Sequence, residues 1–276
     1  MKAPALLVVS AFFHYLGPAF AVLLFARLDV VGVAWLRIAG AAVVFALWRR
    51  SWRVSPPVVL LGVVLAAMNT VFYLAIARLP LATVGAVEFL GVVVLAAAGV
   101  RTVRNAAAVL LAVAGVFTLT EVRLGGAPLG FVLAFVNCGL FMAYIALGHR
   151  IAQDGGVDKL GTAMVTAAVV VTPVGVVGAL PAFRHPVLLL AGLGVGVCSS
   201  VVPYALDQYA MALVRRSTFA LLLSILPAVA TVIGFVVLAQ RPTVPEVVGV
   251  ALVVMAVAVH QSAADPPAVR TSRGSG

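Results

Sequence analysis

The sequence has little charge, and acidic residues are especially scarce. Only 9% of its 276 residues are charged, with 18 Lys and Arg against 8 Asp and Glu, whereas 64% are hydrophobic. Soluble domains carry about 25% charged residues, so composition excludes an ordinary soluble domain and predicts an all-α polytopic membrane protein. The net charge of +10 does not indicate nucleic-acid binding, because the basic residues form short clusters between apolar segments, where they act as topology signals.

Cysteines and enzyme motifs are equally scarce. The two cysteines, Cys138 and Cys198, lie in apolar segments without CxxC or Cys/His spacing, which gives no support to a disulfide or a metal site. Metalloprotease, nucleophile-elbow and phosphate-loop motifs are missing, as are paired aspartate-rich motifs. We therefore expect no cofactor, no metal and no enzymatic activity.

Apolar segments, by contrast, fill the chain. Breaks at charges and at Pro/Gly clusters leave ten of them, at 4–25, 30–48, 57–77, 81–99, 105–120, 128–148, 160–181, 187–209, 217–239 and 244–261. Most reach the roughly 20 residues with which a helix crosses a bilayer. The first also matches a signal-peptide pattern at Ala19-Phe20-Ala21, but its apolar run continues to Ala26. We therefore expect ten transmembrane helices.

The basic residues predict how these helices are oriented. With ten spans both ends of the chain lie on one side. A cytoplasmic N-terminus places 12 Lys and Arg inside and 5 outside, with Arg37 left within the second span. Cytoplasmic loops are enriched in Lys and Arg, so both termini are expected in the cytoplasm.

A weak internal repeat divides the ten spans into two sets of five. The segment 68–73 resembles 199–204, since each places a small polar residue four before a tyrosine. Arg78 and Arg216 each stand ten residues before a position in the next span, Glu88 and Leu226 respectively. An odd number of spans per set makes the sets inverted, as in secondary transporters. We expect repeats at 1–122 and 123–262 and a disordered cytoplasmic tail at 263–276.

Short motifs in both halves also match one family. They are Met68-Asn69, Phe72-Tyr73-Leu74, Leu79-Pro80-Leu81, Val87-Glu88-Phe89, Pro203-Tyr204, Arg216-Ser217-Thr218-Phe219, Leu226-Pro227-Ala228 and Gln240-Arg241-Pro242-Thr243. On these residues the chain resembles the EamA-type branch of the drug/metabolite transporter superfamily, and within it the threonine/homoserine exporters. The resemblance implies two inverted five-helix repeats in a bacterial plasma membrane. It also implies export of small amino acids or related metabolites by alternating access.

Two departures from that family lie in the second half. Such proteins usually carry a Glu just before the second-half proline, where this chain has Leu226, and a Gly-Glu before the last helix, where it has Gln240-Arg241. The second half therefore lacks the acidic group that corresponds to Glu88.

Glu88 is the main candidate site residue, because it lies in the middle of an otherwise apolar span. A charge at the bilayer centre costs roughly 2.5–3.5 kcal/mol on insertion scales, so intramembrane acids usually face a bundle interior or a water-filled path. We expect Glu88 to bind a substrate amino group, a coupling proton, or both. The alternative is a structural residue that ties two helices together.

Further polar residues lie within other spans. Arg37 either binds a substrate carboxylate or pairs with Glu88, or it extends to the headgroups beside Trp35. Asn69, Tyr73 and Tyr204 can face the pathway or join helices by hydrogen bonds. Asp207 or Gln208 shares a helix face with Ser200 and Tyr204, but Asp207 lies near the cytoplasmic end of its span, where solvation is the alternative.

His14 and Asn137 occupy the first span of each half and complete the candidate set, as pathway residues or as packing residues. Pro203 and Pro227 interrupt helices and can expose backbone dipoles to a substrate, whereas Pro18 and Pro173 are interpreted as tolerated kinks.

Three functions follow as hypotheses. The first is a gradient-driven secondary transporter whose partners are a small-molecule substrate and the lipid bilayer, with homodimerisation left open. The second is a membrane-embedded enzyme or lipid-handling protein that uses Glu88 with His14. The third is a scaffold without transport.

Overall fold

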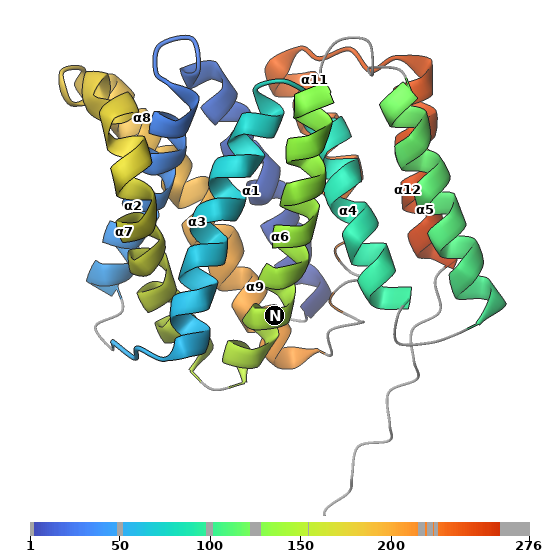
Figure 1. Cartoon of the computed structure of the whole chain (residues 1–276), viewed down its shortest axis with the longest axis horizontal. Helices are drawn as coiled ribbons and strands as arrows, with labels where there is room; N and C mark the ends of the chain where they lie inside the picture. The colour runs from blue at the N-terminus through green and yellow to red at the C-terminus, as the bar shows by residue number, and fades with distance from the viewer. Residues whose placement is uncertain are drawn as a thin grey trace, which may run out of the picture.

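The computed structural model describes residues 3–48, 52–97, 102–121, 128–153, 155–214, 219, 223 and 226–259. Within these residues the regular structure is helical (Figure 1). The helices are α1 (Ala3–Leu24), α2 (Val30–Trp48), α3 (Pro56–Ile76), α4 (Leu81–Ala97), α5 (Val103–Glu121), α6 (Pro128–Ala152), α7 (Gly156–Phe183), α8 (Pro186–Gly196), the π-helix η1 (Val197–Val201), α9 (Val202–Leu213), α11 (Leu226–Leu238) and α12 (Val244–Val259).

The predicted spans agree with these helices. Because α8, η1 and α9 follow one another without a break, they form the single segment expected at 187–209, and the described residues make ten helical segments. Six of the ten are long and apolar enough to cross a membrane, and the other four are shorter apolar helices. The expected span at 217–239 begins as α11 only at Leu226, and most of 215–225 lies outside the described residues. The predicted tail at 263–276 lies outside them as well.

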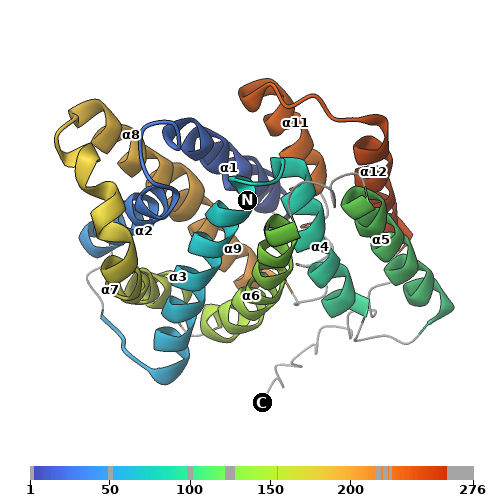
Figure 2. The ribbon, with the colours of Figure 1, turned by 45° about the horizontal axis from the view of Figure 1, so that its top comes forward.

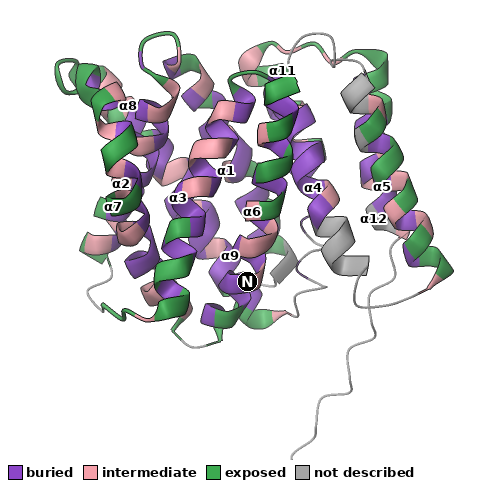
Figure 3. Cartoon of the chain, in the orientation of Figure 1, coloured by how far each residue is buried: buried purple, intermediate pink, exposed green. Residues whose placement is uncertain are grey.

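The outer surface of the bundle is apolar. Side chains such as Leu47, Val174, Val177 and Val236 are more than two-thirds exposed, and the exposed faces lie on the outside of the bundle around a buried interior (Figure 3). Exposed apolar surface on this scale is unfavourable in water but is solvated by lipid tails. The chain is thus a multi-pass membrane protein.

Helix pairs close the bundle at its two ends. At one end of the longest axis α2 packs along α7, and at the other α5 packs along α12 (Figures 1 and 2). Between them α1 packs on α9 and α11, while α3 and α4 both pack on α6. The interior polar side chains of α1, α4, α6 and α9 therefore meet between the two end pairs.

Glycines allow the helices of both end pairs to approach closely. A Cβ atom at Gly32 of α2 would overlap the backbone carbonyl of Gly178 in α7. At the other end, a Cβ atom at Gly115 of α5 would lie 2.6 Å from the carbonyl oxygen of Gly249 in α12. Small residues serve this purpose in membrane helix packing, where van der Waals contact drives association. We call these two contacts the α2–α7 seam and the α5–α12 seam.

Candidate functional site

Glu88 lies in the interior of the bundle, where the sequence placed it. Its side chain is 3% exposed. It accepts a hydrogen bond from the Tyr15 hydroxyl at 3.2 Å and another from Nδ2 of Asn137 at 3.0 Å. Gly85, one turn earlier on α4, makes room for this arrangement, because a Cβ atom there would lie 2.7 Å from the Tyr15 hydroxyl. The carboxylate therefore joins α4 to α1 and α6 through neutral donors.

Arg37 is also buried, with 2% of its side chain exposed. The interpretation in which it extends to the outer headgroups is therefore wrong. Its Nε donates to Oγ of Ser200 at 2.9 Å, and its Nη2 donates to the Ser199 carbonyl at 2.7 Å and more weakly to the Tyr204 hydroxyl at 3.3 Å. In the described part of the chain, Arg37 thus bonds only to uncharged oxygen atoms.

Pro203 explains why the Ser199 carbonyl is free to accept Arg37. In an α-helix that carbonyl would accept the backbone N–H four residues later, but proline has none. The helix adapts through η1, in which the N–H of Val202 reaches the Val197 carbonyl, five residues back. Single π turns of this kind occur frequently at functional sites. The predicted exposure of backbone dipoles at Pro203 corresponds to this acceptor.

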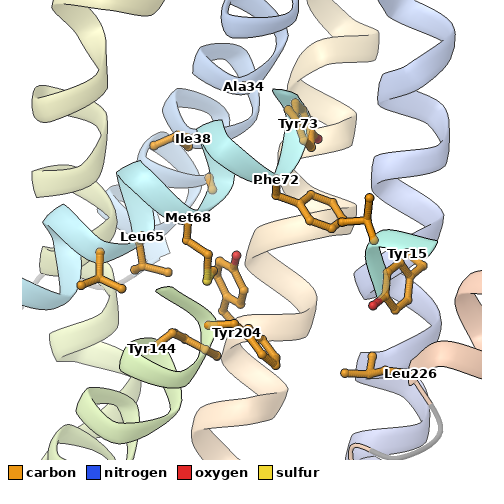
Figure 4. Packing of buried hydrophobic residues seen from close by; sticks show 14 of the residues in the cluster. Tyr15, Ala34, Ile38, Leu65, Met68, Phe72, Tyr73, Tyr144, Tyr204 and Leu226 are labelled. Atoms are coloured by element: carbon orange, nitrogen blue, oxygen red, sulfur yellow. The ribbon is translucent and has the colours of Figure 1, made fainter. Parts of the chain in front are cut away.

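Asn69, Tyr73 and Tyr204 surround the Arg37 guanidinium. The Tyr204 hydroxyl donates to Oδ1 of Asn69 at 3.0 Å, and the guanidinium carbon lies 5.2 Å from the centre of the Tyr73 ring, within cation–π range. Figure 4 shows Tyr73 on α3 and Tyr204 across from that helix. The two segments of the weak repeat, 68–73 and 199–204, therefore meet at one buried cation.

His14 lies between the Glu88 and Arg37 centres. Its ring makes edge contacts with Tyr15, Phe141 and Tyr204, at centroid distances of 5.6, 6.0 and 6.2 Å. Glu88 hydrogen-bonds to Tyr15 and Asn137 rather than to His14 or Arg37. This structure therefore contains neither the expected Arg37–Glu88 pair nor the Glu88–His14 pair that the enzyme hypothesis needs.

Asp207 corrects another expectation. It is 2% exposed rather than solvated, and it accepts hydrogen bonds from Ser10 Oγ at 2.6 Å and from the Tyr144 hydroxyl at 3.0 Å. The second half therefore does supply a buried carboxylate, although at a different place from Leu226. Leu226 is buried at the start of α11, near Tyr15 (Figure 4).

The structure gathers all seven predicted site residues into the buried interior, and it places three further polar side chains there that sequence reasoning did not name. These are Ser10, Tyr15 and Tyr144, which donate to Asp207 or Glu88. Two of them had a signal in the sequence: Tyr15 adjoins His14, and Tyr144 lies seven residues after Asn137, two turns along the same helix face. Among the described residues, no group of three or more His, Cys, Asp and Glu could hold a metal ion.

Comparison with known proteins identifies the family. Over 253 residues the chain is 30% identical to the threonine/homoserine exporter RhtA of Salmonella typhimurium, covering 87% of this chain and 84% of that protein. The RhtA protein of Escherichia coli K12 is 28% identical over 236 residues, which cover 82% and 80% of the two chains. The family model of EamA-like transporters matches residues 128–260. The chain belongs to the EamA-like transporter family.

A solved crystal structure shares this fold. It superposes with a TM-score of 0.60 at 21% identity, over 94% of this chain and 96% of the other. Membership of the EamA family makes the chain a transporter, as the motifs in both halves predicted. The polar interior described above is then the natural place to look for its substrate site.

Proposed function

We propose that this EamA-family protein is a secondary transporter that exports threonine, homoserine or similar small amino acids by alternating access, coupled to protons. The observation that carries the proposal is a pair of buried, oppositely charged residues that are not bonded to each other, Glu88 and Arg37. An amino-acid zwitterion carries the two complementary charges. The relatives named as threonine/homoserine exporters support this substrate class.

Arg37 is suited to hold the substrate carboxylate. The described residues occupy its Nε and Nη2, so the two N–H groups on Nη1 remain for an acceptor. Hydrogen bonds between guanidinium and carboxylate are among the stronger ones in proteins. The Ser199 carbonyl and the Tyr73 ring hold the guanidinium plane in place for such a contact.

Glu88 is suited to hold the amino group or a proton. Both of its oxygen atoms accept from neutral donors, so among the described residues no cation forms an ion pair with it. Oδ1 of Asn137 is buried without a hydrogen-bond partner in the described part of the chain, and it can accept from an ammonium beside Glu88. His14 and the tyrosines on either side of it then line the space between the two ends of the zwitterion.

The packing of the helices supports two inverted repeats, with their boundary at 122/123. Exchanging the halves pairs α1 with α6, α3 with α8–α9, and α4 with α11. Under this exchange the contact of α3 with α6 becomes that of α1 with α9, and the contact of α4 with α6 becomes that of α1 with α11. The two end pairs, α2–α7 and α5–α12, map onto themselves. Both members of each pair of contacts are present.

Transport in vesicles tests the proposal. Purified protein in lipid vesicles would be given a panel of radiolabelled amino acids, including threonine and homoserine, with and without an imposed pH gradient. We expect threonine to accumulate against its gradient only when the proton gradient is present. Vesicles with the Glu88→Gln protein are the matched control, because side-chain volume is kept and charge is lost. Equal movement in both preparations, or none for any small amino acid, would contradict the proposal.

A further inference from the structure

Two buried carboxylates, Glu88 and Asp207, have surroundings that follow one plan, whereas a third, Glu246 of α12, accepts hydrogen bonds from nearby Thr243. Glu88 accepts from Tyr15 on α1 and Asn137 on α6. Asp207 accepts from Ser10 on α1 and Tyr144 on α6. In each case one donor is a tyrosine, contributed by α1 at Glu88 and by α6 at Asp207. The same two helices therefore hold both acids.

The two carboxylates lie at different depths. On α1, the Asp207 partner Ser10 comes five residues before the Glu88 partner Tyr15. On α6, which runs in the opposite direction (Figure 1), the Asp207 partner Tyr144 comes seven residues after the Glu88 partner Asn137. At a rise of 1.5 Å per residue these steps are about 8 Å and about 10 Å. The Asp207 site is thus the one nearer to the membrane side on which α1 begins.

Neutral groups alone bond to Asp207 within the described residues. Ser10 and Tyr144 each donate one hydrogen bond, and Ser10 also lies 3.3 Å from the Pro203 carbonyl. An ionised carboxylate in an apolar interior is strongly disfavoured without a cation. This site therefore needs a bound cation or a proton.

A proton suits the site better than a metal cation does. Hydroxyl groups both donate and accept, so Ser10 and Tyr144 can donate to the ionised acid, and either can turn to accept from the protonated one. A metal ion would need both hydroxyls to turn their hydrogen atoms away from the carboxylate, whereas a proton needs only one of them to turn. The Pro203 carbonyl is within reach to accept the Ser10 hydrogen when that hydroxyl turns.

Four helical elements pack closely against α9, namely α1, η1, α6 and α7. Their described titratable or charged side chains, with those of α9 itself, are His14, Tyr15, Cys138, Tyr144, His149, Arg150, Asp158, Lys159, Cys198, Tyr204 and Tyr209. Of these, Tyr144 alone hydrogen-bonds to Asp207. The Tyr204 ring lies 5.3 Å from the Tyr144 ring and connects the site to Arg37.

We propose that Asp207, with Ser10 and Tyr144, forms a second proton-binding site, separate from Glu88 and nearer the membrane side on which α1 begins. The inference rests on the proposed function, because it assigns a step in proton-coupled transport. A proton passing between the interior and that side binds one oxygen atom of the Asp207 carboxylate, and the carboxyl O–H then donates to a hydroxyl that formerly donated. Protonation of Asp207 thus changes its hydrogen bonds to α1 and α6, the two helices whose side chains also hydrogen-bond to Glu88.

Infrared titration of the purified protein tests the site without any transport. Protonated buried carboxyl groups give a C=O stretching band, and in the wild type Glu88 and Asp207 should each contribute one that titrates, beside any from Glu246 at the start of α12. Asp207→Asn should remove one and Glu88→Gln the other, while Asp158→Asn at the start of α7 should leave both. An Asp207→Asn spectrum identical to that of the wild type would overturn the proposal.

Threonine counterflow and gradient-driven uptake in vesicles then separate this site from the proposed function. We expect Asp207→Asn to retain counterflow within about threefold and to lose at least about tenfold of proton-driven accumulation. Wild-type accumulation in this variant would overturn the inference. Tyr144→Phe keeps the acid but removes one donor to its charged form. The pH profile of proton-driven accumulation should therefore move to higher pH in this variant, and an unmoved profile would also overturn the inference. Absence of threonine counterflow in the wild type would instead contradict the proposed function.

Discussion

At the scale of single residues, the interior keeps its charges apart. Glu88 and Arg37 are both almost fully buried, yet Glu88 bonds to neutral side chains and Arg37 to neutral side chains and a backbone carbonyl. A direct salt bridge between them would neutralise both and leave little affinity for a zwitterion. Holding each charge with weaker, neutral partners preserves its attraction for a substrate group of opposite sign.

The Glu88→Gln variant distinguishes binding from structure. Gln keeps the volume and can still bond to Tyr15 and Asn137, and it removes a charge that costs roughly 2.5–3.5 kcal/mol at the bilayer centre. We expect normal insertion, equal or higher thermal stability, and loss of net threonine export. Glu88→Asp should keep part of the export, because the charge survives on a shorter side chain. Wild-type export by the Gln variant would make Glu88 a structural residue.

Arg37→Lys tests the guanidinium. Lysine keeps the charge but lacks the planar fork, so it cannot hold Ser199, Ser200 and a substrate carboxylate together. Loss of one hydrogen bond to a charged group is worth about 1.5–3 kcal/mol. The KM for threonine, measured in vesicles, should therefore rise roughly tenfold or more while insertion is retained. An unchanged KM would assign Arg37 to helix packing alone.

At the scale of elements, one proline in the α8–η1–α9 segment leaves a backbone carbonyl for a buried arginine. Pro203 withdraws the N–H that would occupy the Ser199 carbonyl, and Arg37 takes its place. The irregular π turn therefore supplies the carbonyl that accepts a hydrogen bond from the buried Arg37.

Pro203→Ala should reverse this arrangement. Alanine supplies an N–H that can bond to the Ser199 carbonyl, which removes part of the roughly 3 kcal/mol that an interior proline costs a helix. We expect a higher Tm, an unfolding free energy raised by about 1–3 kcal/mol, and weaker threonine binding. Calorimetry and substrate titration on the same preparation measure both quantities. A variant that gains stability and binds threonine as tightly as the wild type would contradict the link between Pro203 and Arg37.

Sequence reasoning succeeded for features that are determined by neighbouring residues in the sequence. Apolar length located the spans, and the isolation of Glu88 in an apolar run indicated its burial. The burial of Asp207 and the partners of both acids escaped it, because these depend on which helix faces cover one another. Asp207 stands near a helix end in the sequence, but α1 and α6 pack over it. Leu226 likewise suggested a missing acid that a different helix supplies.

At the scale of the whole molecule, orientation is a prediction from the basic residues. A reporter fused after Glu121, at the end of α5, should lie outside the cell, and one fused after Ser262 should lie in the cytoplasm. Activity of paired phosphatase and fluorescent fusions measures this. Both reporters on one side would refute the inverted five-plus-five arrangement.

The two glycine seams restrict how such a bundle can move. Because α2 meets α7 backbone to backbone at one end and α5 meets α12 at the other, separating the halves at either end would break close van der Waals contact. If transport proceeds by the proposed alternating access, we expect the motion that keeps both seams to be a rocking of one half against the other about a line through Gly32–Gly178 and Gly115–Gly249. The two seams would then be the pivot contacts of this motion, with Glu88, Arg37 and Asp207 lying between them. A cysteine cross-link placed at either seam should leave threonine transport largely intact, whereas one joining α1 to α9 should stop it.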